Sequence, residues 1–382
     1  MKSKHIVCPQ FLSAIAVVLL GCFFATQNLA AQTSPAPTKG PGKIVVRPQF
    51  GGQIGLYDID ASGDEGVFAE QKTLKNGDTL SAVETFSQTT GEIVKVIRKG
   101  ITQFDDDVVL GVVGNSTAIV LHEHATNSGV VRTYNLISPL TANEYTGVWQ
   151  PPDFDSKDIF LGVSRNQGFT NAAFFFLDNI YPGATNFAFS EDVAKNSFGK
   201  QYAMTDRDFE PFLEPAFAYD VNTNTGVLAN DGGCEICVPK IGMVNLATGK
   251  FSHFTGVGKG AVLAIAVDSD DGIAATTTSF DGNIEFYDLK ARTGFAQPLP
   301  GATGEPQAGF DVEYDAIHKL FLVFQGDGPG EHTFIQVYDP KGNLVDSIDF
   351  GPFNRYGGYI ALHPSDRSGF IGEGAVLRSF TY

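Results

Sequence analysis

Two histidines separated by one residue give this sequence its first possible metal-binding chemistry. His122 and His124 lie near the end of a predicted strand, in the segment AIVLHEHA. Alternate residues of a strand point to the same side, so both imidazoles could bind one metal ion. No third or fourth ligand can be identified from the sequence. The alternative interpretation is a polar strand end at the rim of a sheet.

A Cys-x-x-Cys segment supplies the thiol chemistry. Cys234 and Cys237 are the only cysteines after residue 31. Covalent haem attachment would require His in place of Val238, a zinc site would require further ligands, and a redox thiol would require a helix N-terminus that is not predicted. We therefore expect a disulfide that closes a small loop between two strands, in an oxidising compartment.

Acidic side chains offer a weak candidate for calcium or another divalent metal. Oxygen-bearing residues alternate as in the first half of a calcium-binding loop, at Asp58, Asp60, Ser62 and Asp64. The twelfth position, where such a loop carries a bidentate Glu, is Ala69. An acidic surface turn explains the same residues.

Other carboxylates fall where a predicted channel would open. Asp106 and Asp107 precede one predicted inner strand, and Asp311 and Glu313 lie on another. Such groups could hold a cation or assist lactone hydrolysis. No Gly-x-Ser-x-Gly elbow, phosphate loop or dinucleotide fingerprint occurs in the sequence. Catalytic residues cannot be assigned, and both an enzyme and a binding module remain open.

A recurrence of about 48 residues indicates the elements that would position these side chains. Four segments share an apolar strand, a polar corner and a second apolar strand: AFAYDVNTNTGVLAN, AIAVDSDDGIAATTT, FDVEYDAIHKLFLVF and IALHPSDRSGFIGEG. The corner markers, separated by 48, 47 and 49 residues, are Asp220, Asp268, Asp315 and Pro364. A period of this length with several strands per unit predicts an all-β fold, a β-propeller of seven four-stranded blades.

The same pattern predicts how the fold closes and which face binds ligands. The last unit supplies about three strands before Tyr382, so KIVVRPQ near the N-terminus should complete it. With strands a to d numbered outward, the b–c loops and d–a connections share one face, which is usually the binding face of a propeller. The candidates for this face are His122, His124, Asp327, Glu331, His332, Asp106 and Asp107.

The c–d halves of these units resemble the YVTN-type propeller repeat of secreted bacterial proteins. The segments that carry the resemblance are FYDLKARTGFAQPLPG, VYDPKGNLVDSIDFG and MVNLATGKFSHFTGVG. They cover about half of the chain together with their neighbours, and the YVTN tetrapeptide itself is absent. The resemblance implies a propeller fold and a secreted protein, and its relatives include both binding proteins and lactonase-like enzymes.

The composition and the N-terminal segment limit the cellular locations and the classes of partner that are expected. Residues 1–31 resemble a signal peptide, residues 32–43 a Pro/Gly-rich linker, and residues 44–382 the propeller domain. We expect a secreted or periplasmic protein without a transmembrane span in the mature chain; a lipoprotein box ending at Cys22 is the alternative. The net charge of −17 disfavours nucleic acid, which leaves a protein or carbohydrate ligand, or a metal-assisted hydrolase activity resembling a lactonase.

Overall fold

A computed structural model of the 382-residue chain describes most of the sequence after residue 40. The described residues are 41–62, 65–102, 108–113, 118–125, 128–137, 141–145, 158–164, 171–177, 186–192, 197–204, 216–230, 237–278, 281–300, 308–326, 332–352, 359–373 and 375–382. The chain divides into two compact units, Met1–Thr33 and Ser34–Tyr382, and every described residue belongs to the second. The expected signal peptide and Cys22 lie outside the described residues, whereas residues 41–43, assigned above to the linker, begin the first strand.

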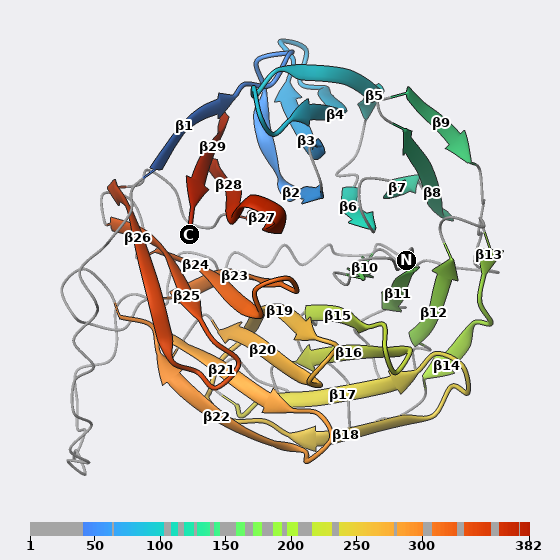
Figure 1. The fold of residues 1–382 in the computed structure, drawn as a ribbon. Helices are drawn as coiled ribbons and strands as arrows, with labels where there is room; N and C mark the ends of the chain where they lie inside the picture. The colour runs from blue at the N-terminus through green and yellow to red at the C-terminus, as the bar shows by residue number, and fades with distance from the viewer. Residues whose placement is uncertain are drawn as a thin grey trace, which may run out of the picture. The chain divides into compact units, whose positions relative to one another are not determined.

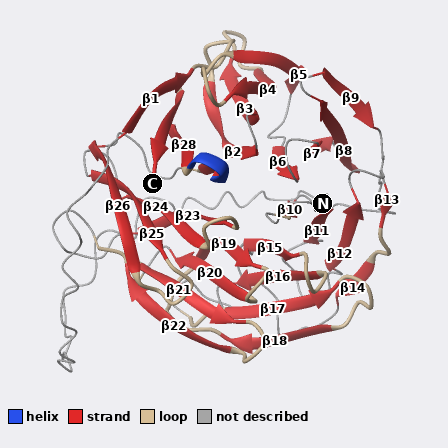
Figure 2. Cartoon of the chain, in the orientation of Figure 1, coloured by secondary structure: helices blue, strands red, loops and turns tan. Residues whose placement is uncertain are grey.

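Antiparallel strands make up nearly all of the described chain, together with the 3₁₀ helix η3 (Pro364–Asp366) (Figure 2). The first two sheets are β2 (Gln53–Ser62), β3 (Glu65–Thr73), β4 (Thr79–Ser87) and β5 (Ile93–Thr102), then β6 (Val108–Val113), β7 (Ala118–Ala125), β8 (Ser128–Ile137) and β9 (Thr141–Tyr145). Next come β10 (Asp158–Val163), β11 (Asn171–Leu177), β12 (Asn186–Asp192), β13 (Ser197–Phe198) and β14 (Tyr202–Met204).

The C-terminal half repeats the four-strand unit with greater regularity. Its sheets are β15 (Ala216–Asp220), β16 (Thr225–Asn230), β17 (Lys240–Asn245) and β18 (Phe251–Thr255); β19 (Val262–Asp268), β20 (Ile273–Thr278), β21 (Asn283–Asp288) and β22 (Thr293–Pro298); and β23 (Ala308–Asp315), β24 (Leu320–Gly326), β25 (His332–Tyr338) and β26 (Leu344–Pro352). The last sheet joins β27 (Ile360–His363), β28 (Ser368–Glu373) and β29 (Val376–Thr381) to β1 (Pro41–Val46).

The innermost strands of successive sheets lie against one another and return to the start. Their order is β2, β6, β10, β15, β19, β23 and β27, and β27 packs against β2 (Figure 1). Apolar side chains fill the spaces between neighbouring sheets; Phe286, for example, packs at ring-centroid distances of 5.7 Å from Phe321 and 6.1 Å from Tyr338 of the next sheet. This closed arrangement of sheets is a β-propeller.

The prediction of seven four-stranded blades is wrong. Among the described residues, six sheets have four strands, and the β10–β14 sheet has five. Its outer edge is split because β13 pairs with one end of β12, at Glu191, and β14 with the other, at Ala188. Gly199 interrupts the edge between them, where its N–H donates to the carbonyl of Ser190 at 2.6 Å. Six regular four-stranded blades are therefore present, not seven.

The predicted closure by an N-terminal strand is confirmed. β1 pairs antiparallel with β29, with Val45 opposite Arg378 and Val46 opposite Leu377. The amide of Ile44 also donates to Ser379 Oγ at 3.1 Å. Val46 is fully buried among aromatic side chains that include Phe86 and Phe370, whereas Val45 is 39% exposed. The N-terminal strand therefore supplies the outer strand of the last sheet and covers its edge.

The repeated corners between strands a and b share one backbone conformation. A residue with positive φ ends each turn, at Asn224, Gly272, Lys319 and Arg367. These positions are 48, 47 and 48 residues apart, so His363 rather than Pro364 is the residue that corresponds to the corner aspartates.

No helix in the described part of the chain combines the length and apolarity of a membrane span.

Two adjacent valines of β1 test the closure. Val46→Asp should lower the free energy of unfolding by about 3 kcal/mol or more, because an unpaired carboxylate would enter an apolar space. Val45→Asp should change it by less than about 1 kcal/mol, because that side chain is partly exposed. Chemical denaturation of both variants gives the comparison, and equal small losses would contradict a structural role for β1.

Candidate functional site

The a–b corners are held by carboxylates that accept backbone hydrogen bonds. Asp315 is fully buried, and its Oδ1 accepts from the amides of Ile317 at 2.9 Å and His318 at 3.0 Å. Asp220 and Asp268 accept from the amides two and three residues later in the same way. Such side-chain acceptors satisfy the donors of a tight turn.

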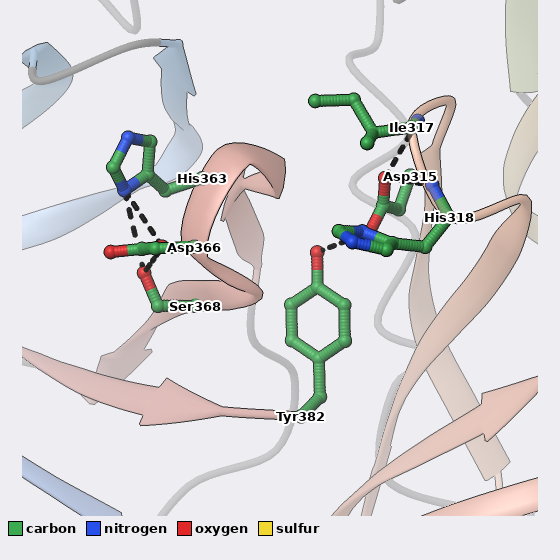
Figure 3. A network of polar contacts seen from close by, with 7 residues as sticks. All are labelled: Asp315, Ile317, His318, His363, Asp366, Ser368 and Tyr382. Carbon is green, nitrogen blue, oxygen red and sulfur yellow. Dashed lines mark hydrogen bonds and ion pairs between the residues drawn. The ribbon is translucent and has the colours of Figure 1, made fainter.

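The second oxygen of Asp315 links its corner to the C-terminal strand. His318 Nδ1 lies 2.8 Å from Asp315 Oδ2, and the hydroxyl of Tyr382 donates to the same oxygen at 2.7 Å (Figure 3). Burial, followed by the charge of Asp315, raises the pKa of Tyr382, so this hydroxyl remains a donor at neutral pH. All of these contacts give the Asp315 carboxylate a structural role, because they hold its turn and the C-terminal residue together.

The last corner replaces the aspartate by His363, which makes no capping hydrogen bond to the backbone. Its Nδ1 lies 2.9 Å from Asp366 Oδ1, and Ser368 Oγ donates to Asp366 at 2.5 Å (Figure 3). Its Nε2 lies 2.9 Å from Ser365 Oγ. The order Ser, His, Asp is that of a nucleophile with its base. All of these residues belong to one turn, at the position where other corners use Asp, so we interpret the cluster as a substitute for the missing cap.

The opposite face carries the b–c loops and d–a connections. His332 begins β25, and its Nδ1 lies 2.9 Å from both carboxylate oxygens of Asp349 on β26. These side chains are 41% and 27% exposed. His332, a predicted binding-face residue, is thus paired with a carboxylate that was not predicted from the sequence. An exposed His–Asp pair can present both donors and acceptors to a ligand.

Apolar side chains are also exposed on this face, beside Cys237. Cys237 is disulfide-bonded and lies between β16 and β17, as the sequence predicts. Its carbonyl accepts from the amide of Gly260 at 3.3 Å, which joins the b–c loop to the connection leading into β19. Val238, in the b–c loop, is 40% exposed, and Leu263, at the start of β19, is 39% exposed.

Buried polar residues on strands b and c support several d–a connections. Gln325 and Gln336 both donate to the carbonyl of Pro300, at 3.0 and 3.1 Å. Glu285 accepts from Thr276 and Thr278, and a Cβ added at Gly258 of the preceding connection would lie 2.5 Å from its Oε1. Burial raises the pKa of Glu285 to about 8.

The corresponding residues of the first sheet are Glu70 and Glu84, both fully buried. Glu84 lies opposite Phe68 as Gln336 lies opposite Val323. None of these residues was predicted from the sequence as a candidate. The signal in the sequence was a Glu or Gln next to apolar residues within a predicted strand, as in GVFAEQK, AVETFS, NIEFYD and TFIQVY.

Several sequence candidates are placed only by their backbone. His122 and His124 lie on β7, opposite Val131 and Gly129 of β8. The predicted calcium-loop residues Asp58, Asp60 and Ser62 lie in the extended strand β2. Asp64, Asp106, Asp107, Cys234, Asp327 and Glu331 lie outside the described residues. Metal binding at these positions stays a prediction.

The inner strand β23 carries the carboxylates proposed for a channel site. Asp311 accepts from the amides of Val312 and Ile360, both at 2.8 Å, and so joins β23 to β27. In the portion of the chain that the structure describes, no three His, Cys, Asp or Glu residues are grouped to hold a metal ion. Asp311 therefore serves the contact between two inner strands.

Truncation of Asp315 tests the structural assignment of the corner network. Asp315→Ala should lower the free energy of unfolding by about 3 kcal/mol, because two amides and the Tyr382 hydroxyl would lose their acceptor inside the protein. Asp339 accepts from Lys341 and Asn343 amides in a more exposed turn, and Asp339→Ala should cost about 1 kcal/mol. Equal losses in denaturant titrations would contradict the assignment.

Comparison with known proteins supports the fold. No protein-family model matches the sequence, and no curated protein matches it. A solved structure described as "Structure of U3-55K" superposes with a TM-score of 0.57 over 90% of this chain and 100% of the other, at 11% sequence identity. At that identity the likeness concerns architecture alone. The chain is thus similar in fold to a known structure and is a β-propeller.

Proposed function

We propose that this protein is a binding scaffold that engages a protein partner through the face formed by its b–c loops and d–a connections. The β-propeller fold is in general suited to protein interaction, because a rigid ring of sheets presents many loops on one face. The observation that carries the proposal is the exposure of Val238 and Leu263 beside the disulfide-bonded Cys237.

The two faces differ in what their side chains are used for. On the corner face, the carboxylates of Asp220, Asp268 and Asp315 are occupied by backbone amides of their own turns. On the opposite face, Asp349 also accepts from the Gly351 amide at 2.6 Å, but the His332–Asp349 pair stays partly exposed. The apolar residues Val238 and Leu263 are exposed on this face as well. Apolar contact combined with a polar rim is typical of protein interfaces. We therefore favour a protein over a carbohydrate ligand.

The hydrolase alternative has less support. A metal-assisted lactonase would need several ligands converging near the inner strands. Among the described inner-strand carboxylates, Asp311 is engaged by backbone amides. In the part of the chain that the structure describes, no arrangement of side chains favours hydrolysis over binding.

Binding can be tested with matched variants on opposite faces. The double variant Val238→Ser/Leu263→Ser should reduce capture of partner proteins from an extract of the source cells by at least tenfold. Ile317→Ser is the control, because Ile317 is 43% exposed but lies in a corner turn on the other face. Quantitative mass spectrometry of the captured proteins measures both. Equal capture by the two variants, or retention only on a glycan array, would contradict this function.

We also propose that the protein acts in a secreted or periplasmic setting, with Cys234 as the disulfide partner of Cys237. The disulfide of Cys237 supports this, since such bonds persist mainly in oxidising compartments. The apolar segment after Lys2 and Lys4 is consistent with export.

Thiol titration of the native protein tests this location. Protein purified from the extracellular or periplasmic fraction should show no reactive thiol at Cys234 or Cys237 before reduction, and two after reduction. Cysteine alkylation followed by peptide mass spectrometry assigns the sites. Two free thiols in the freshly isolated protein, or recovery of the protein only from the cytosol, would contradict the proposal.

A further inference from the structure

The connection that closes the ring of sheets rests on two buried carboxylates. Residues 47–52 join β1, the outer strand of the last sheet, to β2, the inner strand of the first. The amide of Gln49 donates to Glu84 Oε2 at 3.1 Å. The amides of Phe50 and Gly52 donate to the two oxygens of Glu70, at 3.1 and 2.5 Å. Three hydrogen bonds therefore hold this connection against β3 and β4.

The fit between the connection and Glu70 is close. A Cβ added at Gly52 would lie 2.8 Å from Glu70 Oε1 and 2.5 Å from the carbonyl of Gln71, so only glycine allows this approach. On the outer side, Lys72 Nζ donates to the carbonyl of Phe50 at 2.8 Å, and Lys99 Nζ lies 3.7 Å from the centroid of the Phe50 ring. Residues 47–52 are thus in contact with Glu70 on the inner side and with Lys72 and Lys99 on the outer side.

The two carboxylates are not equivalent. Glu70 uses both oxygens, whereas Glu84 Oε1 is buried without a hydrogen-bond partner among the described residues. Burial raises the pKa of Glu84 from its ordinary value of 4.5 to about 7, and the charge of Glu70 acts in the same direction; the Gln49 amide and Lys99 act in the opposite direction. A proton on Oε1 leaves Oε2 free to accept from Gln49.

The chemistry of the surrounding groups favours a proton over a metal ion at this place. Among the described residues, the groups that face the carboxylates are the N–H donors of Gln49, Phe50 and Gly52, with the cation of Lys99 nearby. A metal cation needs oxygen donors and would be repelled by these groups. A proton needs only one acceptor oxygen, which Glu84 Oε1 provides.

We propose that residues 47–52 form a proton-controlled clasp, in which protonated Glu84 holds the ring-closing connection and ionised Glu84 loosens it. When Glu84 ionises, two negative charges lie buried beneath one short segment. Outward movement of the segment admits water to Glu84 and relieves that cost. Because the segment leads directly from β1, loosening it weakens the closure between β1 and β29.

The direction of the pH effect follows from proton linkage. The closed clasp binds the Glu84 proton more tightly than an open, hydrated clasp does. Raising the pH from about 4.5 to about 7 therefore favours opening, by up to about tenfold for each pH unit, and the effect levels off above that window. The clasp is tight in acid and loosened at neutral and alkaline pH.

Amide hydrogen exchange in the full chain tests the clasp. After correction for the intrinsic exchange rate, the protection of peptides covering residues 47–52 should fall by roughly 100-fold between pH 5 and pH 8. Glu84→Gln is permanently neutral and keeps an oxygen acceptor, so its protection should be the same at both values. Glu92→Gln, at an exposed position in the β4–β5 turn, is the matched control and should behave as the wild type.

A second variant keeps the test decisive if Glu84→Gln folds poorly. Lys99→Gln removes the cation that favours ionised Glu84, so it should extend the loss of protection to higher pH and enlarge the difference between pH 5 and pH 8. Constant wild-type protection across this range would overturn the proposal. An unchanged pH dependence in Glu84→Gln, or a smaller one in Lys99→Gln, would overturn it as well.

Discussion

The antiparallel pairing of β1 with β29 is the interaction on which the rest of the structure depends. Every other sheet is built from strands close together in the sequence, but this one joins residues 41–46 to residues 376–381. Without β1 the last sheet would expose an unpaired edge, and its covalent tie to the first sheet through residues 47–52 would be lost, which would leave only the packing of β27 and β28 against that sheet. Burial of Val46 and the hydrogen bond from Ile44 to Ser379 secure the pairing. The clasp at Glu70 and Glu84 continues this closure into the inner strand β2.

The two faces of the ring differ in what their side chains do: those on one face stabilise turns, and those on the other are exposed for binding. Carboxylates on the corner face satisfy the amides of their own turns, and polar side chains such as Asn222, through Ser269 and Asp270, connect neighbouring sheets. Each such group stabilises the turn because a buried amide without an acceptor costs free energy. The face with the b–c loops instead exposes Val238, Leu263 and the His332–Asp349 pair. Binding on that face would leave the turns that hold the sheets undisturbed.

Polar residues buried inside the strands support the connections between neighbouring sheets. Buried polar side chains lie within strands b and c, next to the d–a connections; they are Glu70, Glu84, Glu285, Gln325 and Gln336. Amides at these positions, as in Gln325 and Gln336, hold a connection at any pH. Carboxylates make the same support depend on a proton, because burial raises the pKa of Glu84 and Glu285 into or above the neutral range. The choice of acid or amide therefore determines which connections respond to pH.

The sequence by itself determined the all-β propeller, the corner turns and the closing strand, because each depends on local patterns: alternating apolar residues, an aspartate before a tight turn, and a last unit one strand short. The prediction of seven regular four-stranded blades was wrong because β12 pairs with two short strands, β13 and β14. The edge is interrupted at Gly199, and no alternating pattern in the sequence indicates this. Position on the face of the b–c loops was predictable for Cys237 and His332, but Asp349, the partner of His332, was not. Only the tertiary structure decided that Glu70 and Glu84 share one connection and that Asp311 serves an inter-strand contact, because these contacts join residues far apart in sequence.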